Sequence, residues 1–311
     1  MGGMPQYVCM SNRLSRRNLL KASSAVAFAA AFPLGACQSV ARGFGDRKNP
    51  ISLAQWSLHR AFFDKRLDPL EFAQVSREQY GIGAIEYVNS FFKDKARDLN
   101  YLAQLKQRAT DHDVQSLLIM IDGEGNLGES GADEAIENHK PWIDAAAYLG
   151  CHSIRVNAGG SGTREQVASQ ASASLRQLAE YAAPAGLSIL VENHGGYSSD
   201  GAWLADVMRR ADHPGVGTLP DFGNFRVSAD HMYDRYRGVE ELMPYAKAVS
   251  AKSHEFDAEG NEVHTDYTRM LSIVLDAGYK GHIGVEYEGS KHSESEGILL
   301  TKQLIERVLG A

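Results

Sequence analysis

The chain has 311 residues, of which 43% are hydrophobic and 23% are charged, a composition typical of a soluble globular protein that can bury a sizeable core. Residues 1–36 contain four basic and no acidic residues, so their removal would change the net charge from −7 to 28 − 39 = −11. This acidic balance argues against a nucleic-acid partner, whose phosphates bind a basic surface.

The first 37 residues are typical of an export signal. Arg16 and Arg17 precede an apolar, alanine-rich run over residues 22–36, and the pair resembles the twin-arginine signal. The alternative is a helical N-terminal arm that happens to begin with two arginines. We predict that the twin-arginine export machinery binds this segment and that the protein resides in the periplasm or is anchored to the outer membrane.

The end of the predicted signal, residues 34–37, resembles a bacterial lipobox, which would attach a lipid anchor to Cys37. Cleavage by signal peptidase near the same small residues is the alternative. The glycine-rich, charged segment 38–50 is expected to be a linker. Only Cys151 lies beyond this region, so no internal disulfide is expected.

Beyond the linker, strand-like apolar runs alternate with helical patterns. The strands are expected at residues 51–56, 81–88, 114–121, 153–160, 188–196, 217–225, 249–257 and 282–289, and the helices at residues 68–80, 96–112, 133–149, 163–183, 201–211, 229–246, 266–277 and 294–309. This alternation predicts an α/β fold, a single (β/α)₈ TIM barrel over residues 51–311. A doubly wound open sheet is the alternative, but no glycine-rich phosphate-binding turn follows the first strand.

Four chemically matched side chains recur at the ends of the last four strands. Glu192, Asp221, His254 and Glu286 follow one another at intervals of 29, 33 and 32 residues. One such carboxylate is usually a capping or salt-bridging residue, but all four would meet at the carboxyl-terminal rim of a barrel. Three buried carboxylates need a counterion, and a mixed oxygen and nitrogen cage suits a divalent ion. We predict one bound Mn²⁺, Mg²⁺ or Co²⁺ and favour Mn²⁺.

Other polar side chains of the predicted rim are candidates for binding substrate. Residues two apart on a strand share a face, so His194 would lie beside Glu192, and Lys252 beside His254. The alternative for each is a rim hydrogen bond without substrate contact. The predicted substrate-binding residues are His59, Arg155, Asn157, His194, Asn224 and Lys252, with Glu86 a weaker candidate inside the second strand. His139, His213, His231, His264, His282 and His292 are expected to be solvated or capping residues.

Several short motifs together resemble one known family. They are IEYV at residues 85–88, VEN at 191–193, LPDFGN at 219–224, KSH at 252–254 and GYKGHIGVEYEG at 278–289. The chain from residue 51 onward resembles the xylose-isomerase-like TIM barrels, which include sugar phosphate isomerases and epimerases. The resemblance implies that Glu192, Asp221, His254 and Glu286 bind one divalent ion. In the ketose epimerases of this family the two matching glutamates also exchange protons with the substrate carbon.

Two departures from the family pattern concern the substrate side of the site. Asn224 stands where those epimerases usually have a histidine, and Lys252 stands where many relatives have one. The DNA-repair endonucleases of the same superfamily need more histidines and a basic face, which this sequence lacks.

The resemblance implies a catalytic role for Glu192 and Glu286. We predict a divalent-metal-dependent isomerase or epimerase that acts through an enediolate on a keto sugar or related carbohydrate. One alternative is a lyase or hydratase that acts on 3-keto sugars or glycosides by the same enolisation. Another is a non-catalytic sugar-binding lipoprotein. By analogy with relatives, the protein is expected to form a homo-oligomer.

Overall fold

The computed structural model describes residues 50–310. The predicted twin-arginine signal, the lipobox-like run and the linker up to residue 49 therefore lie outside the described residues. Within residues 50–310, no helix is long and apolar enough to cross a membrane.

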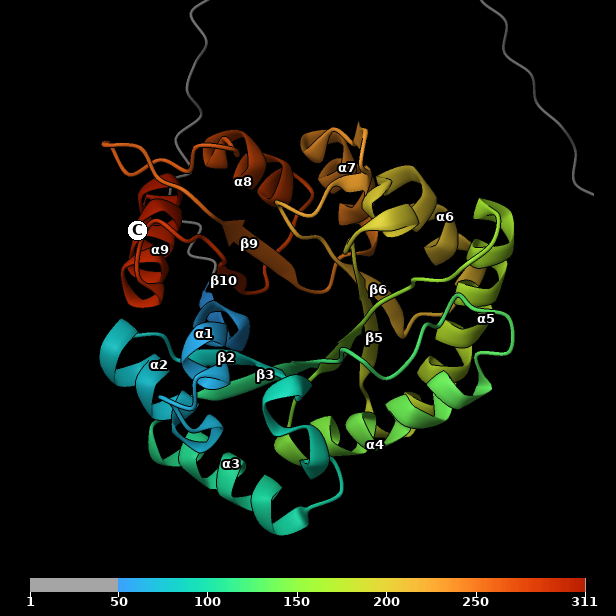
Figure 1. Cartoon of the computed structure of the whole chain (residues 1–311), viewed down its shortest axis with the longest axis horizontal. Coiled ribbons are helices and arrows are strands. Elements are labelled where there is room, and N and C mark those ends of the chain that lie inside the picture. Colours follow the sequence, from blue (N-terminus) through green and yellow to red (C-terminus); the bar gives the residue numbers. More distant parts are fainter. Residues whose placement is uncertain (1–49, 311) are drawn as a thin grey trace, which may run out of the picture. The chain divides into compact units, whose positions relative to one another are not determined.

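Eight parallel strands form the sheet at the centre of the fold, in the order β6-β5-β4-β3-β2-β1-β10-β9 (Figure 1). Each strand pairs with its neighbours along this order, and the predicted (β/α)₈ architecture is confirmed. The strands of this sheet are β1 (Ile51–Ala54), β2 (Ala84–Val88), β3 (Gln115–Met120), β4 (Ser153–Val156), β5 (Ser188–Glu192), β6 (Val216–Leu219), β9 (Val249–Ser253) and β10 (Ile283–Tyr287).

The two end strands of this order, β6 and β9, meet through short contacts that curl the sheet into a barrel. Asp221 and Ser250 form an isolated parallel bridge. The Phe222 N–H donates to the Ser250 carbonyl at 3.0 Å, and the Ser250 N–H donates to the Pro220 carbonyl at 2.9 Å. This closure brings Asp221, just past the end of β6, against Ser250 near the start of β9.

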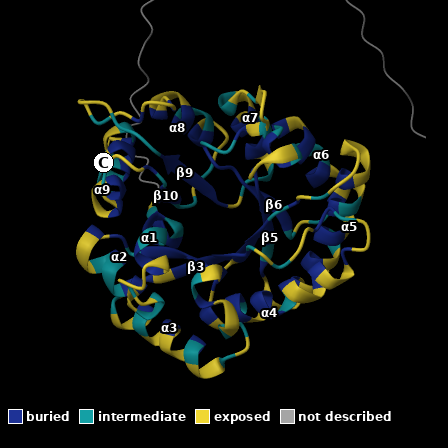
Figure 2. Cartoon of the chain, viewed as in Figure 1, coloured by how far each residue is buried: buried dark blue, intermediate teal, exposed yellow. Residues whose placement is uncertain are grey.

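Helices surround the strands, and the helix faces turned toward the sheet are buried while the outer faces are exposed (Figure 2). Several helices begin where the sequence predicts, because a polar side chain accepts hydrogen bonds from the free N–H groups of the first turn. Thr163 and Gln166 form a capping box before α5, and Ser293 and Glu296 form one before α9. The helices are α1 (His59–Phe63), α2 (Phe72–Tyr80), α3 (Leu99–Asp111), α4 (Asp133–Leu149), α5 (Arg164–Ala182), α6 (Gly201–Ala211), α7 (Arg235–Leu242), α8 (Tyr267–Asp276) and α9 (Glu294–Leu309).

The helix predicted over residues 229–246 is wrong in its first part. A small antiparallel hairpin of β7 (Arg226–Ser228) and β8 (His231–Met232) occupies this region instead. Helix α7 begins only at residue 235, because Asp234 caps it by accepting the Tyr236 and Arg237 N–H groups. The first strand ends at Ala54, two residues earlier than predicted, and the short helix α1 that follows it was not predicted.

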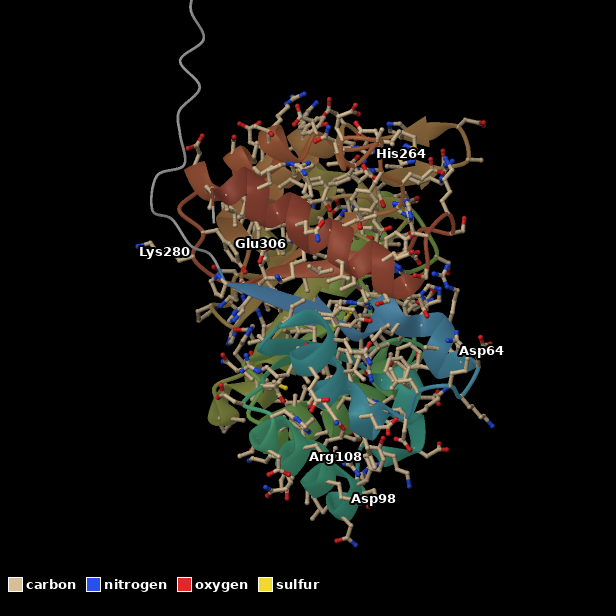
Figure 3. The ribbon with its side chains drawn as sticks, turned by 90° about the vertical axis from the view of Figure 1, so that its left-hand side faces the viewer. Asp64, Asp98, Arg108, His264, Lys280 and Glu306 are labelled. Atoms are coloured by element: carbon tan, nitrogen blue, oxygen red, sulfur yellow. The ribbon has the colours of Figure 1, made fainter. Side chains whose placement is uncertain are left out.

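The carboxyl ends of the strands share one end of the barrel. Figure 3 shows Asp64 and His264, which follow β1 and β9 in the chain, on one side of the molecule, and Lys280, which precedes β10, on the other. The apolar contacts inside the barrel form a small cluster that includes Val88, Leu118, Met120 and Leu190, separate from the larger core between strands and helices. Polar side chains at the strand ends are therefore gathered at one end of the barrel.

Helix α9 packs closely on β10 because residue 297 is glycine. A Cβ atom at this position would lie 2.3 Å from ring atoms of the fully buried Tyr287. We expect Gly297→Ala to lower the free energy of unfolding by about 1–3 kcal/mol, since the ring or the helix must move. Chemical denaturation measures this loss, with the exposed Gln303→Ala on the same helix as the control. An equal effect of both substitutions would contradict this packing role.

Candidate functional site

Three buried carboxylates converge at the carboxyl-terminal end of the barrel. Glu192 ends β5, Asp221 follows β6 and Glu286 lies in β10, and ligand atoms of the three lie within 4.8 Å of one another. Their exposed fractions are 1%, 0% and 3%. The structure thus brings together three of the four residues predicted to bind a metal ion, and we call these three the acidic triad.

Asp221 is held by a net of hydrogen bonds from its own turn and from the neighbouring strand. Its Oδ1 accepts the N–H groups of Gly223 at 2.8 Å and Asn224 at 2.7 Å. The Asn193 side chain accepts the Asp221 N–H at 2.7 Å and donates to the Asp221 carbonyl at 3.0 Å. Asn193 therefore ties the end of β5 to the turn that presents Asp221.

One hydroxyl group, that of Ser250 on β9, bridges two members of the triad. Ser250 Oγ lies 2.8 Å from Asp221 Oδ2 and 2.8 Å from Glu286 Oε2. The hydroxyl has one proton to donate, so both contacts are hydrogen bonds only when one of the carboxyl groups carries a proton. Burial raises the pKa of Asp221 to about 7, although Lys252 acts in the opposite direction. The triad therefore binds a proton or a cation readily.

Arg155, on β4, supports the Glu192 side of the triad. Its NH1 donates to Asp122 at 2.7 Å, and Asp122 also accepts from the Asn157 side chain at 2.8 Å. The Arg155 Nε lies 2.8 Å from Glu192 Oε2 in an ion pair that is not aligned as a hydrogen bond. Burial raises the pKa of Glu192 to about 7, while Arg155 lowers it.

Lys252 is inserted among the carboxylates. Its ammonium lies 3.0 Å from Glu286 Oε1, 3.0 Å from Glu288 Oε2 and 3.9 Å from Asp221 Oδ2, and the side chain is 3% exposed. Register explains this position, because Lys252 and Glu286 are direct partners across β9 and β10. Lys252 thus neutralises part of the triad.

The remaining predicted residues lie at different distances from the triad. Asn224 contacts it directly, since its side chain donates to Glu192 Oε1 at 3.0 Å. His254 is not among the residues grouped with the triad, and its Nε2 lies 3.9 Å from Glu288 Oε2. His59 stacks on Trp56 and bonds the Trp56 carbonyl, and His194 is exposed at the end of β5.

Four contributing residues were absent from the sequence prediction: Asn193, Asp122, Ser250 and Glu288. The alternation of strand residues could have identified two of them, because Ser250 lies two positions before Lys252 and Glu288 two positions after Glu286. His139, expected to be solvated or capping, is instead buried and bonds the Ala135 carbonyl.

The donor set fits a divalent ion in chemistry and charge. If all are ionised, the five carboxylates of Asp122, Glu192, Asp221, Glu286 and Glu288 face the two cations of Arg155 and Lys252, which leaves 2 − 5 = −3. Glu192 Oε2 accepts no aligned hydrogen bond and is held by its ion pair with Arg155, so it still has lone pairs to offer a metal ion. Carboxylate oxygens are the donors that Mg²⁺ and Mn²⁺ prefer.

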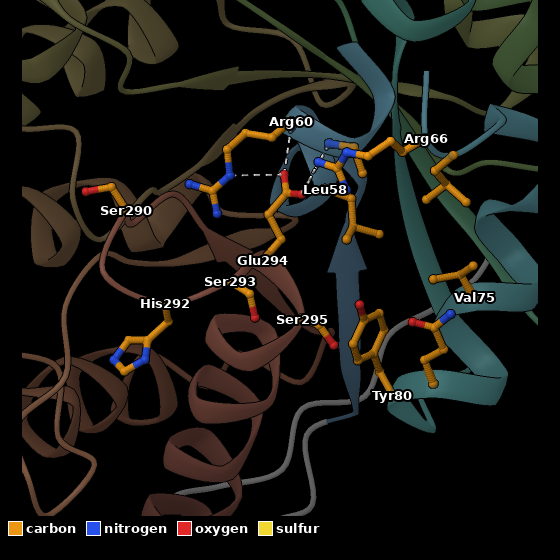
Figure 4. A pocket seen from close by; sticks show the side chains of 13 residues that line it. Leu58, Arg60, Arg66, Val75, Tyr80, Ser290, His292, Ser293, Glu294 and Ser295 are labelled. Atoms are coloured by element: carbon orange, nitrogen blue, oxygen red, sulfur yellow. Dashed lines mark hydrogen bonds and ion pairs between the residues drawn. The ribbon is translucent and has the colours of Figure 1, made fainter. Parts of the chain in front are cut away.

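Two cavities differ in the charged side chains that line them. A cavity of about 330 Å³ is lined by His254, His264 and Glu288, and this Glu288 forms an ion pair with the ammonium of Lys252. A cavity of about 450 Å³ lies at the start of α9, where Glu294 stands between Arg60 and Arg66 (Figure 4). Because the two carboxylates of Glu294 and Asp64 already pair with these two arginines, the second cavity offers an incoming anion no unpaired charge.

Glu86 adds a buried carboxyl group beneath the triad. It is 2% exposed, accepts a 2.6 Å hydrogen bond from Ser52 and leaves Oε2 without a partner. Burial raises its pKa to about 7. The stabilising effect of its protonated form is therefore complete below the ordinary pKa of about 4.5 and is lost as pH rises to about 7.

We expect Glu86→Gln to gain stability relative to the wild type as pH rises from about 5 to about 8, by up to about 3 kcal/mol, because glutamine cannot ionise. Denaturation in EDTA at both pH values measures the difference. The exposed Glu240→Gln should show no such change. A pH-independent difference between Glu86→Gln and the wild type would contradict a raised pKa.

Solved structures with the same fold include proteins that act on sugars. The chain matches D-psicose 3-epimerase with D-tagatose from Clostridium cellulolyticum H10 with a TM-score of 0.63 and 13% identity, over 84% of this chain and 99% of that one. It matches 3-keto-D-glucoside 4-epimerase from E. coli with a TM-score of 0.64 and 16% identity, over 83% and 99%. It matches a xylose isomerase-like TIM barrel protein from Mycobacterium smegmatis in complex with magnesium with a TM-score of 0.64 and 16% identity, over 84% of this chain and 95% of that one.

At these identities the structural likeness is one of fold. A comparison with curated protein sequences gives no match. The family profile described as "Xylose isomerase-like TIM barrel" matches residues 76–307, well over half of the sequence. The chain therefore belongs to the xylose isomerase-like TIM barrel family.

Proposed function

We propose that this protein is a metal-dependent sugar isomerase or epimerase that moves a proton at the carbon beside a carbonyl group. The observation that carries the proposal is the convergence of Glu192 and Glu286, from β5 and β10, on one buried point shared with Asp221. A carbon held between two carboxyl groups can lose its proton to one and regain a proton from the other.

The electrostatics of Glu192 suit a general base or acid that operates near neutral pH. Proton transfer is most efficient when the pKa of the catalytic group lies near the working pH. Burial raises the pKa of Glu192 to about 7, and Asn224 and Arg155 hold its two oxygens in place. Both protonation states are therefore accessible to Glu192 in one orientation.

Glu192, Asp221 and Glu286 would hold the divalent ion, and His254 would be a fourth ligand only if its side chain turned toward the triad. When bound, such an ion polarises a carbonyl oxygen and stabilises the negative charge that develops on it. Manganese is the ion that the sequence favours, and the related fold from Mycobacterium smegmatis was solved with magnesium.

The positive groups of the site have separate roles in the proposal. Arg155, beside Glu192, and Lys252, beside Glu286, would each place a positive charge near an oxyanion that develops on the substrate. His59, Asn157, His194 and Asn224 remain candidates for contacting sugar hydroxyl groups. Two proteins of this fold are a D-psicose 3-epimerase and a 3-keto-D-glucoside 4-epimerase, so keto sugars and 3-keto glycosides are the first substrates to try.

A lyase or hydratase is the second candidate, and the position of Lys252 favours it. Enolisation beside a ketone allows a group β to that ketone to leave, and the departing group needs a proton. The Lys252 ammonium lies 3.0 Å from Glu286, close enough to protonate a leaving group while Glu286 removes the carbon-bound proton. The substrate carbon skeleton after reaction distinguishes the two reactions.

The location of the protein belongs to the proposal and rests on the sequence alone. The pattern of Arg16, Arg17 and the following apolar run favours export in the folded state by the twin-arginine route, with Cys37 the point of lipid attachment. An exported enzyme meets free sugars and glycosides. Fractionation of cells that express the full chain, with Arg16 and Arg17 replaced by lysine as the control, tests this route.

We expect Glu192→Gln and Glu286→Gln each to reduce solvent-proton exchange into substrate by about 10²–10⁴-fold, because each removes one partner of the proton transfer. Proton NMR in D₂O against ketohexoses and 3-keto glycosides measures the exchange and shows whether a glycosidic bond breaks. Glu306→Gln, on the outer helix α9, is the matched control. Near-wild-type exchange in either triad variant would overturn the assignment.

A further inference from the structure

The ammonium of Lys252 lies beside the buried carboxylates of the triad, which need a positive charge nearby. Its ammonium lies 3.0 Å from Glu286 and 3.9 Å from Asp221, two of the three members of the triad. Three carboxylates, those of Asp221, Glu286 and Glu288, lie within 3.9 Å of this ammonium and pair with its charged form. The side chain therefore stays charged inside the barrel.

The same ammonium has a second partner outside the triad. Glu288 Oε2 lies 3.0 Å from Lys252 Nζ, and Glu288 Oε1 accepts a hydrogen bond from the Trp56 indole at 2.9 Å. Trp56 thus orients the Glu288 carboxylate toward the lysine. Glu288 is not among the residues whose ligand atoms converge on the metal position.

We infer that Lys252 is the resident cation of the acidic triad, that a divalent ion competes with its ammonium for Glu286 and Asp221, and that Glu288 retains the ammonium when the ion displaces it. This inference rests on the metal-binding part of the proposed function. It concerns the affinity of the site rather than its reaction.

The charges at the triad and the second partner of the ammonium both support competition. An ammonium in contact with Glu286 Oε1 and a divalent ion bound to the same triad would repel each other strongly in a buried site. The ammonium can leave Glu286 without losing all its partners, because it already touches Glu288. The lysine also satisfies buried carboxylates in the absence of metal, so the barrel mouth is held together without an ion.

The inference predicts metal affinities that change in opposite directions. We expect Lys252→Gln to bind Mn²⁺ at least about tenfold more tightly than the wild type, because no ammonium has to be displaced. We expect Glu288→Gln to bind Mn²⁺ several-fold more weakly, because the displaced ammonium loses its second partner. Calorimetric titration of the metal-stripped full chain with MnCl₂ measures both.

A double variant separates direct competition from a general change in charge. If Glu288 acts through Lys252, then adding Glu288→Gln to Lys252→Gln changes the Mn²⁺ affinity by less than about twofold, whereas independent charge effects add. Lys252→Arg keeps the charge and should bind Mn²⁺ no more tightly than the wild type. Lys247→Gln, before the start of β9, is the control and should bind like the wild type.

Thermal unfolding gives a second measure that does not depend on calorimetry. In EDTA, Lys252→Gln should melt below the wild type, and Mn²⁺ should raise its melting temperature more than it raises that of the wild type. Unchanged or weaker Mn²⁺ binding by Lys252→Gln, an additive double variant or no binding by any variant would overturn the inference. These experiments contain no sugar, so absence of sugar turnover would count against the proposed reaction alone.

Discussion

The structure depends on the placement of three carboxyl groups within a few ångströms of one another in the interior of a barrel. Carboxylates buried without partners would be too costly in free energy to persist. Each therefore has a specific partner from another strand: Arg155 faces Glu192, Ser250 joins Asp221 to Glu286, and Lys252 lies against Glu286. The mouth of the barrel is organised as a network of ion pairs and hydrogen bonds that links β4, β5, β9, β10 and the turn after β6.

The parallel barrel is what allows this network to form. Residues two apart on a strand point to the same side, so Ser250 and Lys252 of β9 both enter the barrel interior. The register then places Lys252 opposite Glu286, and the bridge between Asp221 and Ser250 closes the ring. Most of the apolar burial lies outside the strands, between them and the helices. The interior is thus free to carry polar side chains at its upper end without loss of the main core.

The network also gives the site its chemical character. Burial favours the protonated forms of Glu192 and Asp221, while Arg155 and Lys252 favour the ionised forms, so small changes in the surroundings shift protons within the site. Enolisation needs groups that can accept and return a proton beside a stabilised negative charge.

The sequence by itself predicted the barrel, because eight apolar runs alternate with helical patterns and because capping residues such as Thr163 and Ser293 mark where helices begin. It also predicted that Glu192, Asp221 and Glu286 meet at one end of the barrel, since each stands near a strand end at the spacing of one βα unit, and the structure brings the three together. The hairpin in place of the start of the helix predicted over residues 229–246 was missed, because a two-strand ribbon is set by contacts that local propensity does not encode.

Only the tertiary structure decided that Lys252 rather than His254 lies against the triad, and that Asn193, Ser250 and Glu288 belong to the site. The reason is physical: spacing along the chain fixes which strand carries a residue, but strand register and ring closure determine which side chains meet inside the barrel.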